Sequence, residues 1–189
     1  YEALIYRMPP RFRSVKRAKI VRDQDSFKRN LNLYILSEDF DRKLTTSSQI
    51  LKNNIKVWLN QYRMLNDTLD ILDPRIINIK ISFVAVVDYS QEKLEALNIA
   101  ITEIQSMFRE QLDIGQPIYI TKIYDVLNNL DEIVDVTHVK IENATGSNYS
   151  DETINLSQYM SADGRILYAP ENVIYELKYP NLDIKGTIK

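Results

Sequence analysis

The sequence contains no cysteine and only one histidine among its 189 residues. The lack of cysteine excludes disulfides and thiolate chemistry, and it fits assembly in a reducing cytoplasm. With His138 alone, neither a zinc site nor a histidine-based catalytic site has support, because each normally needs further ligands or a nucleophile. We therefore expect His138 to be a surface or packing residue.

Glycine and long apolar runs are also scarce. Gly115, Gly146, Gly164 and Gly186 are too far apart to form a phosphate-binding loop. No apolar run approaches the roughly 18 residues of a membrane span, so we expect no membrane contact. The polar, basic N-terminal segment predicts no signal peptide, and Tyr1 in place of Met suggests part of a longer chain. Together these absences predict a non-enzymatic protein with no catalytic residue, metal or cofactor.

The charge of the chain is distributed unevenly. The net charge is −2 overall, yet residues 1–30 carry nine Lys and Arg against three Asp and Glu, a local charge of +6. We predict a charged docking arm whose basic residues are Arg11, Arg13, Lys16, Arg17, Lys19 and Arg22. The arm could dock on an acidic neighbouring subunit or another copy of this chain, bind nucleic acid, or simply be solvated. Nucleic acid is the less expected partner, since Phe12 is the only interleaved aromatic residue.

Apolar spacing predicts most of the helices and strands. Residues 31–36 and 77–87 read as strands, the second with every odd position apolar and its far end buried on both faces. Thr45 to Ser48 offer N-cap hydroxyls for a helix whose apolar positions follow at spacings of three and four. A longer helix over 91–111 is expected to bury a stripe of five residues, and its members are Leu94, Leu97, Ile101, Ile104 and Phe108.

The second half of the chain continues this mixed pattern. A short strand (117–120), a helix (121–130) and a bulged or edge strand (133–142) are predicted, and 23–27 could open a short helix. Residues 143–172 are rich in turn residues and predict surface loops with a hairpin. A last alternating strand (173–179) precedes an extended tail after Pro180. Asp67, Asp70 and Asp73 could ligate a hard cation, but they more simply read as solvated acids at a helix end.

This order of elements predicts an α+β fold: small mixed sheets packed by helices, with a split-βαβ-like body and a loop-rich C-terminal hairpin region. Three segments are expected. They are a basic N-terminal arm with a short strand (1–45), an α+β body (46–142) and a loop-rich β extension (143–189).

The same segments resemble the baseplate J family of contractile phage tails over roughly residues 13–180. The resemblance lies in RAKIVRDQDSF (17–27), LNLYIL (31–36), the helix ILKNNIKVWLNQYRMLND (50–67), the strand segment LDPRIINIKISFVAVVD (72–88) and DIGQPIYITKIYDVLNNLDEIVDVTHVKI (113–141). Two of these, 54–67 and 111–136, are similar to the C-terminal part of the large baseplate wedge proteins of T-even-like phages. Residues 19–20, 24–25 and 132 depart from the family pattern.

The resemblance implies a structural subunit of the virion tail baseplate. It implies a homodimer, with a ring of dimers linking adjacent wedges around the tail hub, and contacts with other wedge subunits. It also implies rearrangement when the baseplate switches before sheath contraction. The family supplies no catalytic residue.

Overall fold

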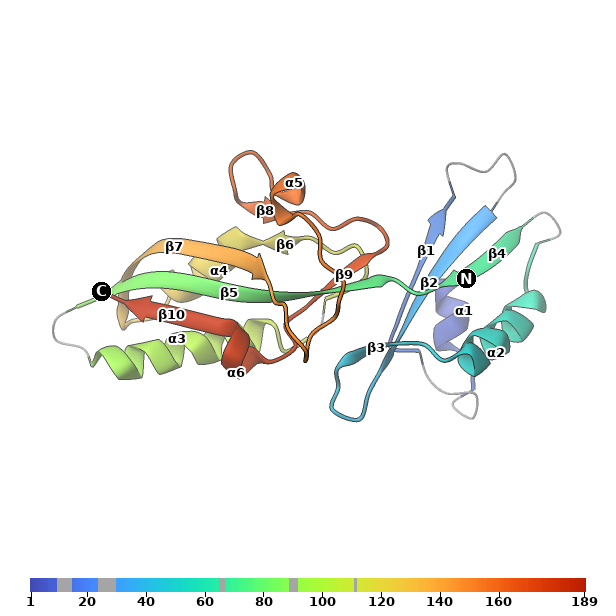
Figure 1. Ribbon diagram of the computed structural model, residues 1–189, viewed down its shortest axis with the longest axis horizontal. Helices are drawn as coiled ribbons and strands as arrows, with labels where there is room; N and C mark the ends of the chain where they lie inside the picture. The colour runs from blue at the N-terminus through green and yellow to red at the C-terminus, as the bar shows by residue number, and fades with distance from the viewer. Residues whose placement is uncertain (10–14, 24–29, 65–66, 89–91, 111) are drawn as a thin grey trace. The chain divides into compact units, whose positions relative to one another are not determined.

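The computed structural model describes residues 1–9, 15–23, 30–64, 67–88, 92–110 and 112–189, which form two compact units (Figure 1). Unit 1 comprises Tyr1–Arg75 with Glu171–Val173, and unit 2 comprises Ile76–Pro170 with Ile174–Lys189. Both units combine helices with a mixed sheet, so the predicted α+β class is confirmed. The bounds of these two units differ from those of the three segments that we expected from the sequence. The three segments describe changes in composition and stay a prediction.

Unit 1 is a four-stranded sheet with two helices. Its elements are α1 (Glu2–Tyr6), β1 (Arg17–Arg22), β2 (Asn30–Glu38), β3 (Leu44–Thr46), α2 (Gln49–Asn60) and β4 (Thr68–Leu72). β2 lies at the centre, antiparallel to β1 and β3 and parallel to β4. β3 and β4 share one side of β2, because the residues of β2 that pair with them also pair with β1 on the other side. The strand predicted at 31–36 is therefore confirmed, and the helix suggested at 23–27 lies outside the described residues.

The core of unit 1 lies between the sheet and its helices. α2 begins where the hydroxyls predicted it, because the Ser48 side chain accepts a hydrogen bond from the backbone N–H of Leu51. Its buried residues Leu51, Ile55 and Leu59 recur at helical spacing and pack with Leu33 of β2. The apolar period of the sequence thus decides which face of α2 meets the sheet.

Unit 2 is built around one long strand. Its main elements are β5 (Arg75–Val87, which begins in unit 1), α3 (Lys93–Met107), β6 (Ile118–Tyr119), α4 (Ile120–Asn128), β7 (Ile133–Asn143), α5 (Leu156–Tyr159), β8 (Ile166–Leu167), β9 (Val173–Glu176), α6 (Pro180–Asp183) and β10 (Ile184–Ile188). β5 pairs antiparallel with β7 and parallel with β10, and it also pairs with β9. The register of β7 shifts twice, which confirms the predicted bulge. The short strand β6 pairs with β8 instead of joining this sheet, so β5 and β7 are direct neighbours and not the split strands of a βαβ unit.

In β5, the face formed by the odd-numbered residues is buried as predicted. All its odd positions from Ile77 to Val87 are buried. The prediction that its far end is buried on both faces is wrong, because Val84 and Val86 are only half-buried. Asn78, read from sequence as part of the polar face, is buried, since it is held by hydrogen bonds to other segments.

The buried face of the longest helix, α3, differs from the predicted apolar stripe. In α3 the buried residues are Ala96, Ala100 and Ile104, whereas Leu94 is 68% exposed. α3 packs against β10, where Gly186 has no side chain and Leu97 lies over it. Two of the three buried residues of α3 are alanines, so the buried face does not follow from the positions of the large apolar side chains.

The end of the chain is the clearest correction. We predicted an extended tail after Pro180, but residues 180–183 form a helical turn and residues 184–188 add β10 to the main sheet beside β5. The expected alternating strand over 173–179 is shorter, and all four residues of β9 are buried. Both strands gain their partners from a segment about 100 positions earlier, which no local pattern reports.

Candidate interaction surfaces

The described part of the basic arm is a sheet strand. Lys16 Nζ lies 3.0 Å from Glu38 Oε2, so this charge is paired with the end of β2. Arg17, Lys19 and Arg22 belong to β1, which pairs with residues 31–36. The described half of the arm is therefore held against β2, and its docking role stays a prediction. Arg11 and Arg13 lie outside the described residues.

The face of β1 that carries Arg17 and Lys19 points away from the apolar core of unit 1. Ala18 and Ile20 pack against the apolar core of unit 1. Because side chains alternate along a strand, Arg17, Lys19 and Val21 lie on the opposite face. Lys19 pairs there with Tyr34 of β2 and is half-buried. This face can offer two cations side by side to an anionic partner.

Several large apolar side chains are exposed. Ile50 (74% exposed) and Val57 (65%) lie seven residues apart on α2, which places them on the same outward face. Phe40 is fully exposed in the β2–β3 turn, which is held by hydrogen bonds from Asp39 N–H to Lys43 O and from Arg42 N–H to Asp39 O. Ordered, exposed apolar side chains of this kind are typical of protein contact sites.

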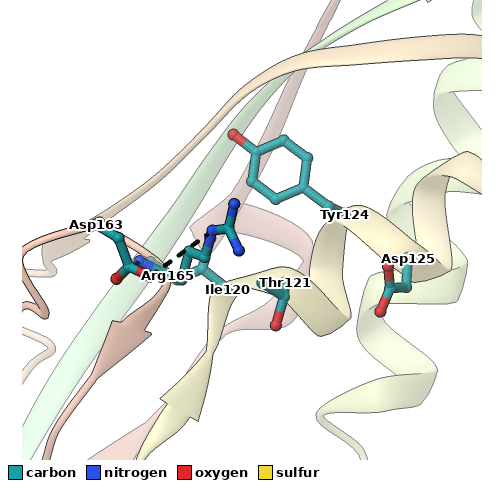
Figure 2. Close-up of a pocket in the computed structure, with 7 residues that line it drawn as sticks. Ile120, Thr121, Tyr124, Asp125, Asp163 and Arg165 are labelled. Atoms are coloured by element: carbon teal, nitrogen blue, oxygen red, sulfur yellow. Dashed lines mark hydrogen bonds and ion pairs between the residues drawn. The ribbon is translucent and has the colours of Figure 1, made fainter.

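Unit 2 contains an open pocket of about 380 Å³ between α4 and the 161–165 turn (Figure 2). Gly164 allows the turn with φ +69°, and Arg165 O accepts the first free N–H of α4, from Ile120. Arg165 Nε lies 3.7 Å from Asp163 Oδ2. Figure 2 shows the Asp163–Arg165 pair on one side, with Asp125 on another side of α4.

The polar groups of this pocket are mostly engaged in holding the fold. Tyr124 Oη accepts a hydrogen bond from Val139 N–H of β7 at 2.9 Å. Hydrogen bonds from Ser161 Oγ and from Arg165 N–H lower the pKa of Asp163, so this carboxylate is charged near neutral pH. The pocket offers one guanidinium and two carboxylates to a polar side chain of a partner.

The three aspartates that could have formed a cation site each interact with a different residue. Asp67 is buried and accepts a hydrogen bond from Tyr1 Oη, Asp70 accepts one from Asn30, and Asp73 pairs with Lys52. Among the described residues, no group of three or more His, Cys, Asp or Glu is placed to hold a metal ion. His138 is exposed on β7.

Sequence reasoning missed two polar clusters in unit 2. The buried Asp183 accepts hydrogen bonds from Tyr149 Oη (2.5 Å) and Tyr179 N–H (2.8 Å). The bond to Asp183, with some burial, raises the pKa of Tyr149 to about 12. In the other cluster, buried Asn78 donates to Glu176 Oε2. An Asn within an apolar strand and a Tyr within a turn-rich loop were the only sequence signals.

Asn78 and Tyr149 tie the loop after β7 to the sheet. Asn78 Oδ1 accepts the backbone N–H of Ser150 at 2.6 Å, one residue beyond Tyr149. Each of these groups has a hydrogen-bond partner, which offsets the cost of removing it from water. The loop-rich segment is thereby fixed against β5 and α6.

Comparison with known proteins gives one informative result. No protein-family model matches the chain, and no curated protein matches it. Among solved structures, it is similar to a chain of the anti-feeding prophage baseplate, described as "Cryo-EM structure of the anti-feeding prophage (AFP) baseplate, 6-fold symmetrised". The TM-score is 0.51 at 13% sequence identity, and the match covers 92% of this chain and 35% of that chain. The two share a fold, and this chain spans about a third of the baseplate chain.

No helix among the described residues is both long and apolar enough to cross a membrane.

Proposed function

We propose that the chain is a non-enzymatic structural part of a contractile-tail baseplate, located in the virion tail. The observation that carries this proposal is the fold shared with a baseplate chain over 92% of the present sequence. The sequence resemblance to the baseplate J family points to the same class independently. Because the match covers 35% of the other chain, the proposal concerns the part of such a subunit that this fold forms.

Within this role, the family resemblance supports a wedge subunit that dimerises, links neighbouring wedges into a ring around the tail hub and contacts other wedge subunits. It would assemble in the host cytoplasm and rearrange during the switch that triggers sheath contraction. The exposed pair Ile50 and Val57 on α2 is the surface that we assign first to the contact with a second copy, because it offers two large apolar side chains on an uncharged face with Asn53 and Asn54 between them.

The first experiment measures the mass of the purified chain by light scattering and sedimentation. A dimer is expected at micromolar concentration, and the double variant Ile50→Glu and Val57→Glu should shift it to monomer. Leu94→Glu is the matched control, since Leu94 is equally exposed but lies on α3 of unit 2. A wild-type chain that stays monomeric at high concentration would argue against self-association.

A second experiment tests the baseplate role itself. The chain is co-expressed with the other wedge subunits of its phage, and assemblies are isolated through a tag on one of those subunits. Co-purification in fixed stoichiometry is expected. Its absence, with both partners folded, would contradict the proposal.

A further inference from the structure

Only one face of the unit 2 sheet is packed against α3 and α4, which contact each other as well as β10 and β7. On that face Leu97 of α3 lies over Gly186 of β10, and Phe83 of β5 is buried beside them. Because side chains alternate along a strand, the even positions of β5 point to the opposite face. Ser82 and Val84 lie there and are only half-buried, so the described residues leave this face open.

Two lysines flank Ser82 on the open face. Strand pairing places Lys140 of β7 beside Ser82 on one side and Lys185 of β10 beside it on the other. Both lysines are exposed. Lys140 Nζ lies 2.7 Å from Glu142 Oε1, whereas Lys185 forms no ion pair with any described residue. Lys80, two positions along β5, is half-buried and adds a third cation to the same face.

Val84 and Val86 continue the open face along β5 as a narrow apolar strip. Val84 lies between Thr187 of β10 and His138 of β7, and both of these neighbours are exposed. The half-buried valines therefore keep apolar area that a partner can bury. The face combines this strip with the cations around Ser82.

The cations of the open face contrast with the charge of unit 2 as a whole. Unit 2 contains nine Lys and Arg against 16 Asp and Glu, a net charge of −7. Two carboxylates lie on the open face: Glu142 is paired with Lys140, and Asp135 lies beside Val86. β10 contains no Asp or Glu, so the side of the face that carries Lys185 attracts an acidic partner.

The width of the open face matches one helix. Neighbouring strands are about 4.8 Å apart, so β10 and β7 lie about 10 Å apart across β5, close to the diameter of an α-helix with its side chains. A helix laid along β5 would place an apolar stripe over Val84 and Val86. Acidic residues on the two flanks of that helix would then lie beside Lys185 and Lys140.

A nucleic acid matches this face less well than a protein does. Its phosphates would meet the carboxylates of Glu142 and Asp135, which repel them. The three strands also place no Phe, Tyr or Trp on this face for bases to stack on. An acidic protein segment that also carries apolar residues would use both the lysines and the valine strip.

We propose that the open face of the unit 2 sheet is a docking site for an acidic amphipathic helix of a partner protein. The apolar stripe of the helix covers Val84 and Val86, and Lys185 and Lys140 select its acidic flanks. Burial of the stripe supplies affinity, and the charges supply specificity. Only the source of the helix, a neighbouring subunit, rests on the proposed baseplate function.

The test uses the full chain and a fluorescein-labelled peptide of about 18 residues, with leucine at helical spacing and glutamate on both flanks. Binding is measured by fluorescence anisotropy and located by amide shifts. Saturable binding is expected, with shifts centred on 80–86, 138–142 and 184–188. Lys185→Glu should weaken binding by about fivefold or more. Lys93→Glu, which changes an exposed lysine on α3 of the same unit, is the matched control and should leave affinity unchanged.

Two further peptides separate a helix on this face from simple charge attraction. A peptide of the same composition without the apolar stripe should bind about fivefold more weakly or worse, and so should a peptide with lysine in place of glutamate. Equal binding of either peptide, an unchanged affinity of Lys185→Glu, shifts confined to unit 1, or no saturable binding would overturn the proposal.

Two other outcomes would assign the face to a different ligand and also overturn the proposal. One is duplex DNA that displaces the peptide and shifts the same amides. The other is self-association of the free chain that shifts them. Peptide binding without wedge co-purification would support the docking site and count against the proposed baseplate function, so the two failures are distinguishable.

Discussion

Replacing Gly186 by alanine tests how closely β10 is packed into the sheet of unit 2. A Cβ atom at this position would lie 2.4 Å from Leu97 Cδ1 and 2.4 Å from Phe83 Cζ. Ordinary contacts between carbon atoms are about 3.5–4.0 Å, so both side chains would have to retreat by about 1 Å or more. Phe83 is fully buried, and a dense core gives its ring little room to move.

The magnitude follows from two opposing terms. Gly186 does not adopt a positive φ, so alanine fits its backbone, and the smaller entropy of the unfolded chain would stabilise the variant by about 0.4–1 kcal/mol. Overpacking a buried site typically destabilises by about 1–3 kcal/mol. We therefore expect Gly186→Ala to lower the free energy of unfolding by about 1–2 kcal/mol.

The assay is urea unfolding followed by far-ultraviolet circular dichroism, because Trp58, the single tryptophan, lies in unit 1 and does not report directly on β10. A lower midpoint with an unchanged slope is the expected result. Thr187→Ala is the control, since this neighbour on β10 is exposed and its loss leaves the packing intact.

An unchanged or raised stability of Gly186→Ala would refute the reasoning. A second variant locates the obstacle: in a Phe83→Leu background, the smaller side chain should absorb part of the added methyl group. The cost of Gly186→Ala should then fall, which a double-mutant cycle measures as a coupling energy. An identical cost in both backgrounds would show that the Phe83 ring is not what the methyl group meets.

Three further predictions follow from individual contacts. Ser48→Ala should destabilise unit 1 by about 1 kcal/mol through loss of the α2 cap, with Ser48→Gly less harmful, and Trp58 fluorescence during urea unfolding measures it. Tyr149→Phe should lower the free energy of unfolding by about 1–3 kcal/mol, because buried Asp183 loses a hydrogen-bond donor. The stabilisation by the Tyr149 hydroxyl is fully present below pH 10 and should disappear as the pH rises through the raised pKa of about 12. A difference in stability between wild type and variant that stays constant from pH 9 to 12 would count against this prediction. Duplex DNA should bind weakly with a shallow salt dependence, whereas a log–log slope steeper than about −3, lost on replacing Lys19, would favour nucleic-acid binding.

Much of the local structure could be predicted from sequence because burial leaves a periodic trace. The alternation over 77–87 gave the central strand, and Ser48 with the spacing of Leu51, Ile55 and Trp58 gave α2, although Leu59 rather than Tyr62 completes its buried face. The helix stripe failed in α3 because Ala96 and Ala100, which no stripe of large apolar residues includes, are buried, whereas Leu94 is exposed.

The sequence could not predict which surface of the fold is open to a partner. The sequence drew attention to the basic residues of the N-terminal segment, and the described ones proved to lie on β1, with Lys16 beside it. Nothing in the segments 133–143 and 184–188 indicates that Lys140 and Lys185 flank Ser82, because the pairing of both strands with β5 decides it. Likewise, the edge of β1 is closed because side chains from elsewhere, those of Tyr6 and Glu2, reach its outward N–H groups.

The sequence by itself determined the α+β class and most helices and strands. Each depends on residue type and short-range spacing. Only the tertiary structure decided that residues 184–188 pair with β5, that Asp183 and Asn78 are buried with partners, and which strand edges are closed. These features depend on groups brought together across about 12 to 100 positions, and no local pattern in the sequence reports such partners.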